Sequence, residues 1–84
     1  MNKITVRYFA SIREAIGQGS ESVETAAATL GALRDELIAR GDAYASSLAR
    51  GKAVRMALNQ LLSEDAAALT DGAEVAFFPP VTGG

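Results

Sequence analysis

The last six residues of the chain, 79–84, have the residue types and spacing that could take part in chemistry. The paired prolines stiffen the base of this segment, and the final two glycines leave its tip without side chains. Six extended residues reach about 20 Å, which is long enough for a narrow tip to enter a deep pocket on another protein. We therefore interpret residues 79–84 as an extended tail. The residues that we predict to insert into a partner are Pro79, Pro80, Val81, Thr82 and Gly83.

The carboxylate of Gly84 is the distinctive reactive group of this tail. With an ordinary pKa of about 3.3–3.7 it is ionised at neutral pH, and a carboxylate is a poor electrophile. Conversion to an acyl adenylate would open its carbonyl carbon to attack by sulfur or nitrogen. Glycine at this position keeps steric bulk away from the catalytic groups of another protein. The pattern thus predicts a carrier whose reactive position is its own last residue.

The composition excludes most other side-chain chemistry. The sequence has no cysteine and no histidine, which rules out disulfides, Cys/His zinc sites and imidazole catalysis. We therefore predict no metal site and no cofactor bound by the chain itself. The eight basic and ten acidic residues give a net charge of −2, which argues against a nucleic-acid partner. Without a long apolar stretch or a secretory signal, we expect no membrane association and a cytoplasmic location.

Alternation of apolar and polar residues predicts strands at residues 3–9, 53–59 and 73–78. Shorter strands are indicated at 21–25 and 61–62. The turn between the last two strands contains Gly72, where glycine would supply a positive φ.

Apolar residues at helical spacing, Leu30, Leu33 and Leu37, predict the main helix, with Thr29 as its N-cap. Its polar residues are expected on the solvated side, Arg34 among them. We also predict a short helix over residues 11–16 with Ser11 as its N-cap, and another that Asp42 caps and that runs through Tyr44 and Leu48 to end at Gly51.

The order strand, strand, helix, strand, strand predicts a single α+β domain over residues 1–78, followed by the tail at 79–84. In this architecture one main helix packs across one face of a mixed β-sheet. Strand parity places Phe9 and Phe78 on the opposite, open face, with Leu62 as a candidate neighbour. Two interpretations remain open from parity: a docking patch for another protein, or a satellite core under a short helix or loop.

The segment AEVAFFPPVTGG at residues 73–84 resembles the C-terminus of the small subunits of molybdopterin synthase, a family of ubiquitin-like sulfur carriers. The resemblance extends to VRYFASIREAIG at residues 6–17, to LGALRDEL at 30–37 and to LNQ at 58–60. It implies the ubiquitin-like β-grasp fold, in agreement with the predicted order of elements. It also favours the docking interpretation for Phe9, Leu62 and Phe78.

The resemblance further implies a function. Gly84 would be adenylated by a ubiquitin-activating-like adenylyltransferase that consumes ATP, and a sulfurtransferase would supply sulfur to form a thiocarboxylate, 1-thioglycine. The tail would then enter the large subunit of molybdopterin synthase and donate sulfur to cyclic pyranopterin monophosphate. Such complexes pair two small with two large subunits. The chain would be the sulfur-donating subunit, with no catalytic side chains of its own.

Other functions are compatible with a Gly-Gly end. A ubiquitin-like modifier would use the same adenylate to form isopeptide bonds with lysines. A sulfur carrier of another pathway, such as thiamine biosynthesis, is a close neighbour of the leading hypothesis, although such carriers are usually shorter and lack the aromatic-proline run. A β-grasp interaction module with an inert tail would need no chemistry at Gly84.

Overall fold

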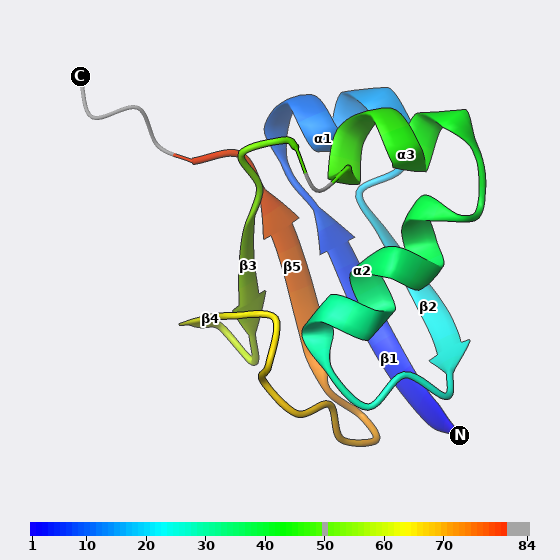
Figure 1. Cartoon of the computed structure of the whole chain (residues 1–84), viewed down its shortest axis with the longest axis vertical. Helices are drawn as coiled ribbons and strands as arrows, with labels where there is room; N and C mark the ends of the chain where they lie inside the picture. Colours follow the sequence, from blue (N-terminus) through cyan, green and yellow to red (C-terminus); the bar gives the residue numbers. More distant parts are fainter. Residues whose placement is uncertain (50, 81–84) are drawn as a thin grey trace.

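The computed structural model describes residues 1–49 and 51–80, which form a five-stranded sheet with helices packed on one face (Figure 1). The strand order is β2-β1-β5-β3-β4; β1 and β5 are parallel, and the other neighbours are antiparallel. The predicted mixed sheet is therefore confirmed. The elements are β1 (Asn2–Tyr8), α1 (Ala10–Ile16), β2 (Ser20–Thr25), α2 (Leu30–Ile38), α3 (Asp42–Leu48), β3 (Arg55–Leu58), β4 (Leu61–Ser63) and β5 (Glu74–Phe78).

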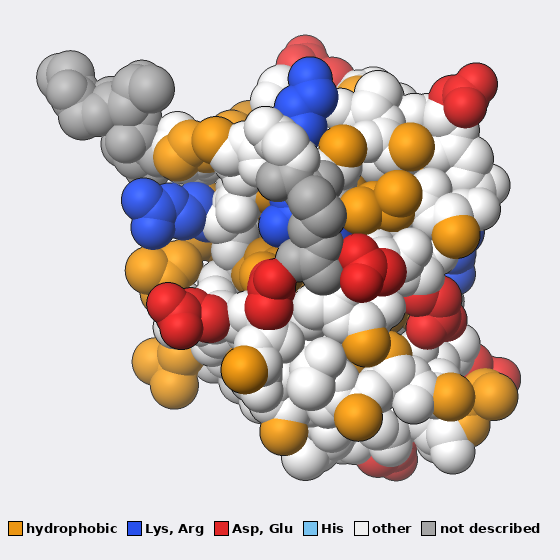
Figure 2. All heavy atoms as spheres, in the orientation of Figure 1, with side chains coloured by type: hydrophobic (Ala, Val, Ile, Leu, Met, Phe, Trp, Pro, Cys, Tyr) orange, Lys and Arg blue, Asp and Glu red, His pale blue; other side chains and the backbone are white. Residues whose placement is uncertain are grey.

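The core lies between the sheet and α2, as the alternation of β1 and β5 predicts. Helix α2 crosses the face of the sheet, and α1 and α3 lie together at one end (Figure 1). Seen from this side, acidic, basic and apolar side chains are interspersed on the surface (Figure 2). Each fully buried large apolar side chain contributes about 1.5–3 kcal/mol through removal from water. The fully buried residues at the centre are Ile4, Val6, Val75 and Phe77 from the sheet and Leu30, Leu33 and Leu37 from α2.

The predicted N-cap is confirmed for α2 but is wrong for α1 and α3. In α3, Asp42 is the first helical residue, Gly41 holds the N-cap position and no side chain caps the helix. Thr29 is the N-cap of α2, and its Oγ1 accepts a 3.2 Å hydrogen bond from the Ala32 amide, as predicted. The prediction of Ser11 as the N-cap of α1 is wrong, because Phe9 occupies that position and no side chain caps the helix. The first turn closes instead on the Phe9 carbonyl, which accepts hydrogen bonds from the amides of Ile12 (3.1 Å) and Arg13 (3.2 Å).

Arg34 corrects a second prediction, because it is 6% exposed and not on a solvated face. Its Nε donates to the Leu48 carbonyl at 2.7 Å, and its Nη2 donates to the Ala49 carbonyl at 2.8 Å. These carbonyls are at the C-terminal end of α3, where a cation also interacts favourably with the helix dipole. Arg34 thus joins α2 to α3.

Strand β5 ends at Phe78, and the two prolines that follow have no amide hydrogen to continue the ladder. The tail residues Val81, Thr82, Gly83 and Gly84 lie outside the described residues, so the division into a domain at 1–78 and a tail at 79–84 stays a prediction. No helix in the described part of the chain is both long enough and apolar enough to cross a membrane.

Candidate functional site

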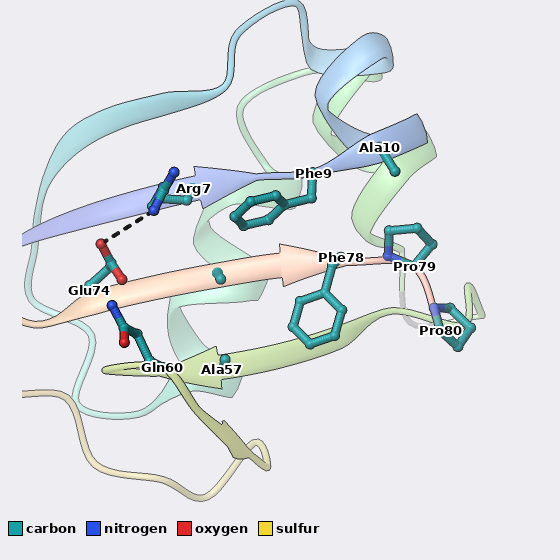
Figure 3. Close-up of a pocket in the computed structure, with 10 residues that line it drawn as sticks. Arg7, Phe9, Ala10, Ala57, Gln60, Glu74, Phe78, Pro79 and Pro80 are labelled. Atoms are coloured by element: carbon teal, nitrogen blue, oxygen red, sulfur yellow. Dashed lines mark ion pairs between the residues drawn. The ribbon is translucent and has the colours of Figure 1, made fainter. Parts of the chain in front are cut away.

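An apolar groove runs along the open face of the sheet and reaches the root of the tail (Figure 3). Its volume is about 680 Å³, within the range of protein binding pockets. Because the groove includes the root of the tail, a partner that bound the tail would also contact this face of the sheet. The lining residues are Arg7, Phe9, Ala10, Ala57, Gln60, Glu74, Ala76, Phe78, Pro79 and Pro80.

Strand register explains the shape of this groove. Ala76 of β5 lies opposite Arg7 of β1 on one side and opposite Ala57 of β3 on the other. Directly opposed residues share a face of the sheet, so the two alanine methyl groups form a low floor. The rings of Phe9 and Phe78 stand beside this floor (Figure 3). Small side chains next to large aromatic ones create the hollow.

The groove also has a charged end. The Arg7 guanidinium lies 3.9 Å from the Glu74 carboxylate and 5.2 Å from the centroid of the Phe9 ring. Both side chains of the ion pair are partly exposed, so the pair contributes at most about 1 kcal/mol to stability. Arg7 nevertheless places a positive charge over an aromatic face, an attractive arrangement. A partner would meet aromatic surface beside the tail and a paired charge further along.

The structure brings two of the three predicted docking residues together. Phe9 is 39% exposed and Phe78 is half-buried, and both line the groove. Phe9 is neither in the core nor among the hydrophobic residues packed against it, which does not favour the satellite-core interpretation for this residue. Leu62 is 64% exposed and lies opposite Ala57 in the register, but it lines a separate hollow beside Arg55. A docking role for the three residues stays a prediction.

Six further groove residues were not predicted as site residues from the sequence: Arg7, Ala10, Ala57, Gln60, Glu74 and Ala76. For four of them, Arg7, Ala57, Glu74 and Ala76, strand parity indicated the open face, because they alternate with the buried residues of β1, β3 and β5. Gln60 had no such signal, since its position depends on the turn between β3 and β4. Within the described part of the chain, no group of three or more Cys, His, Asp or Glu could hold a metal ion.

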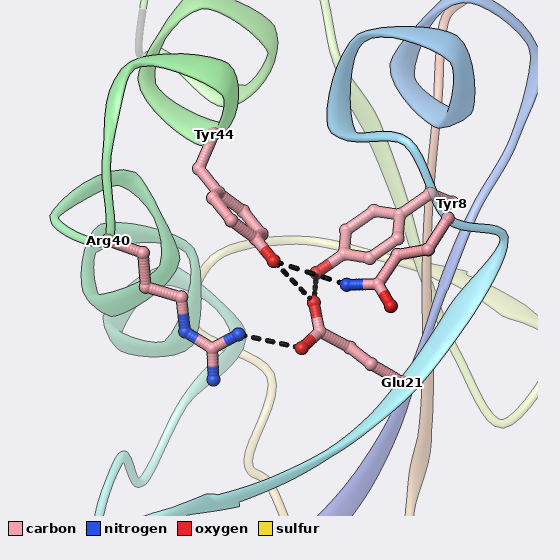
Figure 4. Close-up of polar contacts among 5 residues, drawn as sticks. Tyr8, Glu21, Arg40 and Tyr44 are labelled. Carbon is pink, nitrogen blue, oxygen red and sulfur yellow. Dashed lines mark hydrogen bonds and ion pairs between the residues drawn. The ribbon is translucent and has the colours of Figure 1, made fainter.

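A polar cluster on the helix-covered face is separate from the groove (Figure 4). The Glu21 carboxylate accepts hydrogen bonds from the hydroxyls of Tyr8 (2.7 Å) and Tyr44 (2.9 Å) and from Nη1 of Arg40 (2.7 Å). Burial would raise the pKa of Glu21, but these hydrogen bonds outweigh burial and hold the pKa below its usual value. Burial, together with the bond to Glu21, raises the pKa of Tyr8. The cluster ties β1 and β2 to the α2–α3 region.

A mixed β-sheet crossed by one main helix, with an apolar groove at the root of a Gly-Gly tail, defines a ubiquitin-like protein of the β-grasp class. The model of the ThiS family matches residues 6–84, and the chain belongs to this family.

Two curated relatives carry the name molybdopterin synthase sulfur carrier subunit. The protein from Escherichia coli is 46% identical and the protein from Haemophilus influenzae is 43% identical. Each alignment covers 96% of this chain and 99% of the relative. The resemblance stated from the sequence is thus confirmed.

Solved structures show the same fold. The solution structure of the Haloferax volcanii HVO 2177 protein matches with a TM-score of 0.81 and 33% identity, over 99% of this chain and 87% of that one. A chain from the complex of subunits 1 and 2 of the molybdopterin-converting factor of Helicobacter pylori matches with a TM-score of 0.68 and 26% identity. That match covers 98% of this chain and 99% of the other. The predicted β-grasp fold is confirmed.

Proposed function

We propose that the chain is the sulfur carrier subunit of a molybdopterin synthase, with Gly84 as the residue that carries the sulfur. The observation that supports this most directly is the near full-length similarity to curated proteins of that name. The family match also extends to residue 84, which the proposal makes the reactive position. The absence of cysteine and histidine fits a subunit whose partners hold the catalytic groups.

The proposed chemistry has four steps. The Gly84 carboxylate attacks the α-phosphorus of ATP on an adenylyltransferase, which forms an acyl adenylate and releases pyrophosphate. A sulfur nucleophile at the oxidation level of sulfide, delivered by a sulfurtransferase, then attacks the acyl carbon, and AMP leaves. The thiocarboxylate sulfur then attacks a carbon of cyclic pyranopterin monophosphate and displaces an oxygen there, which gives a thioester between Gly84 and the substrate. Water hydrolyses this thioester, so the sulfur stays on the product and the Gly84 carboxylate is regenerated.

The groove supplies the means of docking in this proposal. Phe9 and Phe78 would anchor the open face of the sheet on the large subunit, because exposed aromatic side chains contribute strongly to protein interfaces. Pro79 and Pro80 line the same groove, so an anchored sheet would direct the tail into the partner. The likeness to a chain from a two-subunit complex supports a large-subunit partner. We propose an assembly of two small and two large subunits.

Intact-mass spectrometry tests this function. Incubation with the adenylyltransferase, ATP and a sulfur donor should raise the mass by the difference between sulfur and oxygen. A variant that lacks Gly84 should keep the fold and show no such shift. An unchanged mass for the wild-type chain with its cognate partners would contradict the proposal. Higher-mass conjugates on lysines in cell extract would instead favour the protein-modifier alternative.

A further inference from the structure

Backbone strain in this protein is concentrated around the groove. In residues 1–49 and 51–80, three non-glycine residues adopt a left-handed backbone: Ala10 (φ 50°), Asn59 (φ 50°) and Gln60 (φ 70°). This conformation brings Cβ close to a carbonyl oxygen and is uncommon for residues other than glycine, asparagine and aspartate. Ala10 and Gln60 both line the groove, and Asn59 is next to it in sequence.

The strain at Asn59 has a local explanation. Leu58 pairs with Leu61, so β3 and β4 are joined by a two-residue turn in which both residues have positive φ. This is the type I′ geometry, which favours asparagine followed by glycine. The Asn59 amide donates to the Glu74 carbonyl at 2.8 Å, and its Oδ1 accepts from the Glu74 amide at 3.0 Å. Asn59 therefore suits its position and fixes the hairpin to β5.

Gln60 has no comparable explanation. Glycine is the residue that this second turn position favours, and the Gln60 side chain is exposed. Within the described residues it forms no hydrogen bond with another side chain or with the backbone. Its carboxamide instead points towards Glu74 (Figure 3). The turn requires the left-handed backbone at residue 60 but not a glutamine, since glycine would adopt this backbone without strain. A strained residue whose exposed side chain does not contribute to the fold suggests a role in function.

We propose that Gln60 is a docking residue that pairs with a backbone peptide group of the large subunit seated in the groove. A carboxamide both donates and accepts hydrogen bonds, so it matches a peptide N–H and C=O. The partner segment presents apolar side chains to Phe9 and Phe78 and its backbone to Gln60. The inference rests on the proposed function, because it takes the large subunit as the occupant of the groove.

Two substitutions separate the side chain from the strained backbone. Gln60→Gly removes both the carboxamide and the strain, so it should raise the urea midpoint of unfolding while lowering the affinity for the large subunit about fivefold, equivalent to one hydrogen bond. Gln60→Ala keeps a Cβ in the left-handed conformation, so it should lower the affinity equally without raising the midpoint. Isothermal titration of the purified subunits and urea unfolding give the two readouts.

The matched control is the other glutamine of the chain, Gln18, which lies outside the groove. Gln18→Ala should leave the affinity unchanged. Wild-type affinity in Gln60→Ala would overturn the inference, and so would a loss confined to Gln60→Gly. If the wild-type chain acquires sulfur but does not bind the large subunit, the choice of occupant is wrong. If it does neither, the proposed function itself fails.

Discussion

The hydroxyl of Tyr8 on β1 donates a 2.7 Å hydrogen bond to the carboxylate of Glu21 on β2. Because Tyr44 of α3 and Arg40, which follows α2, bond to the same carboxylate, one acidic side chain joins the sheet to α3 and to the turn after α2. The ring of Tyr8 also stacks on Phe77 of β5, with centroids 6.2 Å apart. The cluster thus continues into the apolar core.

Glu21→Ala should lower the free energy of unfolding by about 1–3 kcal/mol, because the hydroxyls of Tyr8 and Tyr44 lose their shared acceptor in a partly buried site. Urea unfolding measures this change. Glu24→Ala is the matched control, since Glu24 is an exposed residue on the same strand. Equal midpoints for the two variants would show that the cluster does not stabilise the fold.

The lowered pKa of the Glu21 carboxylate leads us to expect that the protein loses stability in acid. The pKa of Glu21 is lowered in the folded state, so its contribution is complete above the unfolded pKa of about 4.3 and is lost as pH falls through the folded pKa. The stability difference between wild type and Glu21→Gln should therefore shrink between pH 6 and pH 3. Urea unfolding across this pH range measures the stability difference. A difference that increased as the pH fell would contradict the prediction.

Arg34→Lys should lower the melting temperature, because a single ammonium group cannot reproduce the forked contacts to the Leu48 and Ala49 carbonyls. Hydrogen bonds from a charged group contribute about 1.5–3 kcal/mol each, and a buried carbonyl would lose its partner. Differential scanning calorimetry measures the shift. Arg55→Lys alters an exposed arginine on β3 and should leave the melting temperature close to that of the wild type.

Periodicity predicts those parts of the fold that depend on neighbours along the chain. The alternation of Ile4 and Val6 identifies the buried face of β1, and Thr29 marks the start of α2, because strand parity and capping are local. The burial of Arg34 could not be predicted in this way. It depends on α3 folding back over α2, a contact between segments 14 residues apart.

The candidate site was likewise predictable only where it depends on local strand parity. Parity placed Phe9 and Phe78 on the open face, where both line the groove. It gave no indication that Leu62 would line a different hollow, because the β3–β4 hairpin sets that position. Gln60 was missed for a related reason: a glutamine in a left-handed turn carries no periodic signal.

Gly72→Ala should destabilise the protein by about 1–2 kcal/mol, because residue 72 has φ 83° in the turn before β5 and a Cβ is strained in that conformation. The strain comes from the backbone alone, since no atom lies within 4 Å of the added Cβ. Gly51→Ala is the control, since its Cβ would also meet open space and residue 51 is not among those with positive φ. A similar urea midpoint in the two variants would contradict this argument.

Two substitutions on the open face test the predicted docking residues. Phe9→Ala should weaken binding to the large subunit by about 1–3 kcal/mol, since exposed aromatic residues are frequent interface anchors. Phe9 is 39% exposed and outside the core, so the free energy of unfolding should change little. Leu62→Ala should weaken binding as well if the interface extends from the groove to the β3–β4 hairpin. Isothermal titration measures both affinities.

Leu61→Ala is the control for this pair, because Leu61 is 72% exposed but, as the neighbour of Leu62 along β4, projects to the other face of the strand. It should bind as the wild type does. A loss with Phe9→Ala alone would confine the interface to the groove, whereas a loss with Leu62→Ala would extend it across the hairpin. Wild-type binding by both Phe9→Ala and Leu62→Ala would contradict the docking prediction, because the exposed side chains on this face would then contribute nothing to the partner.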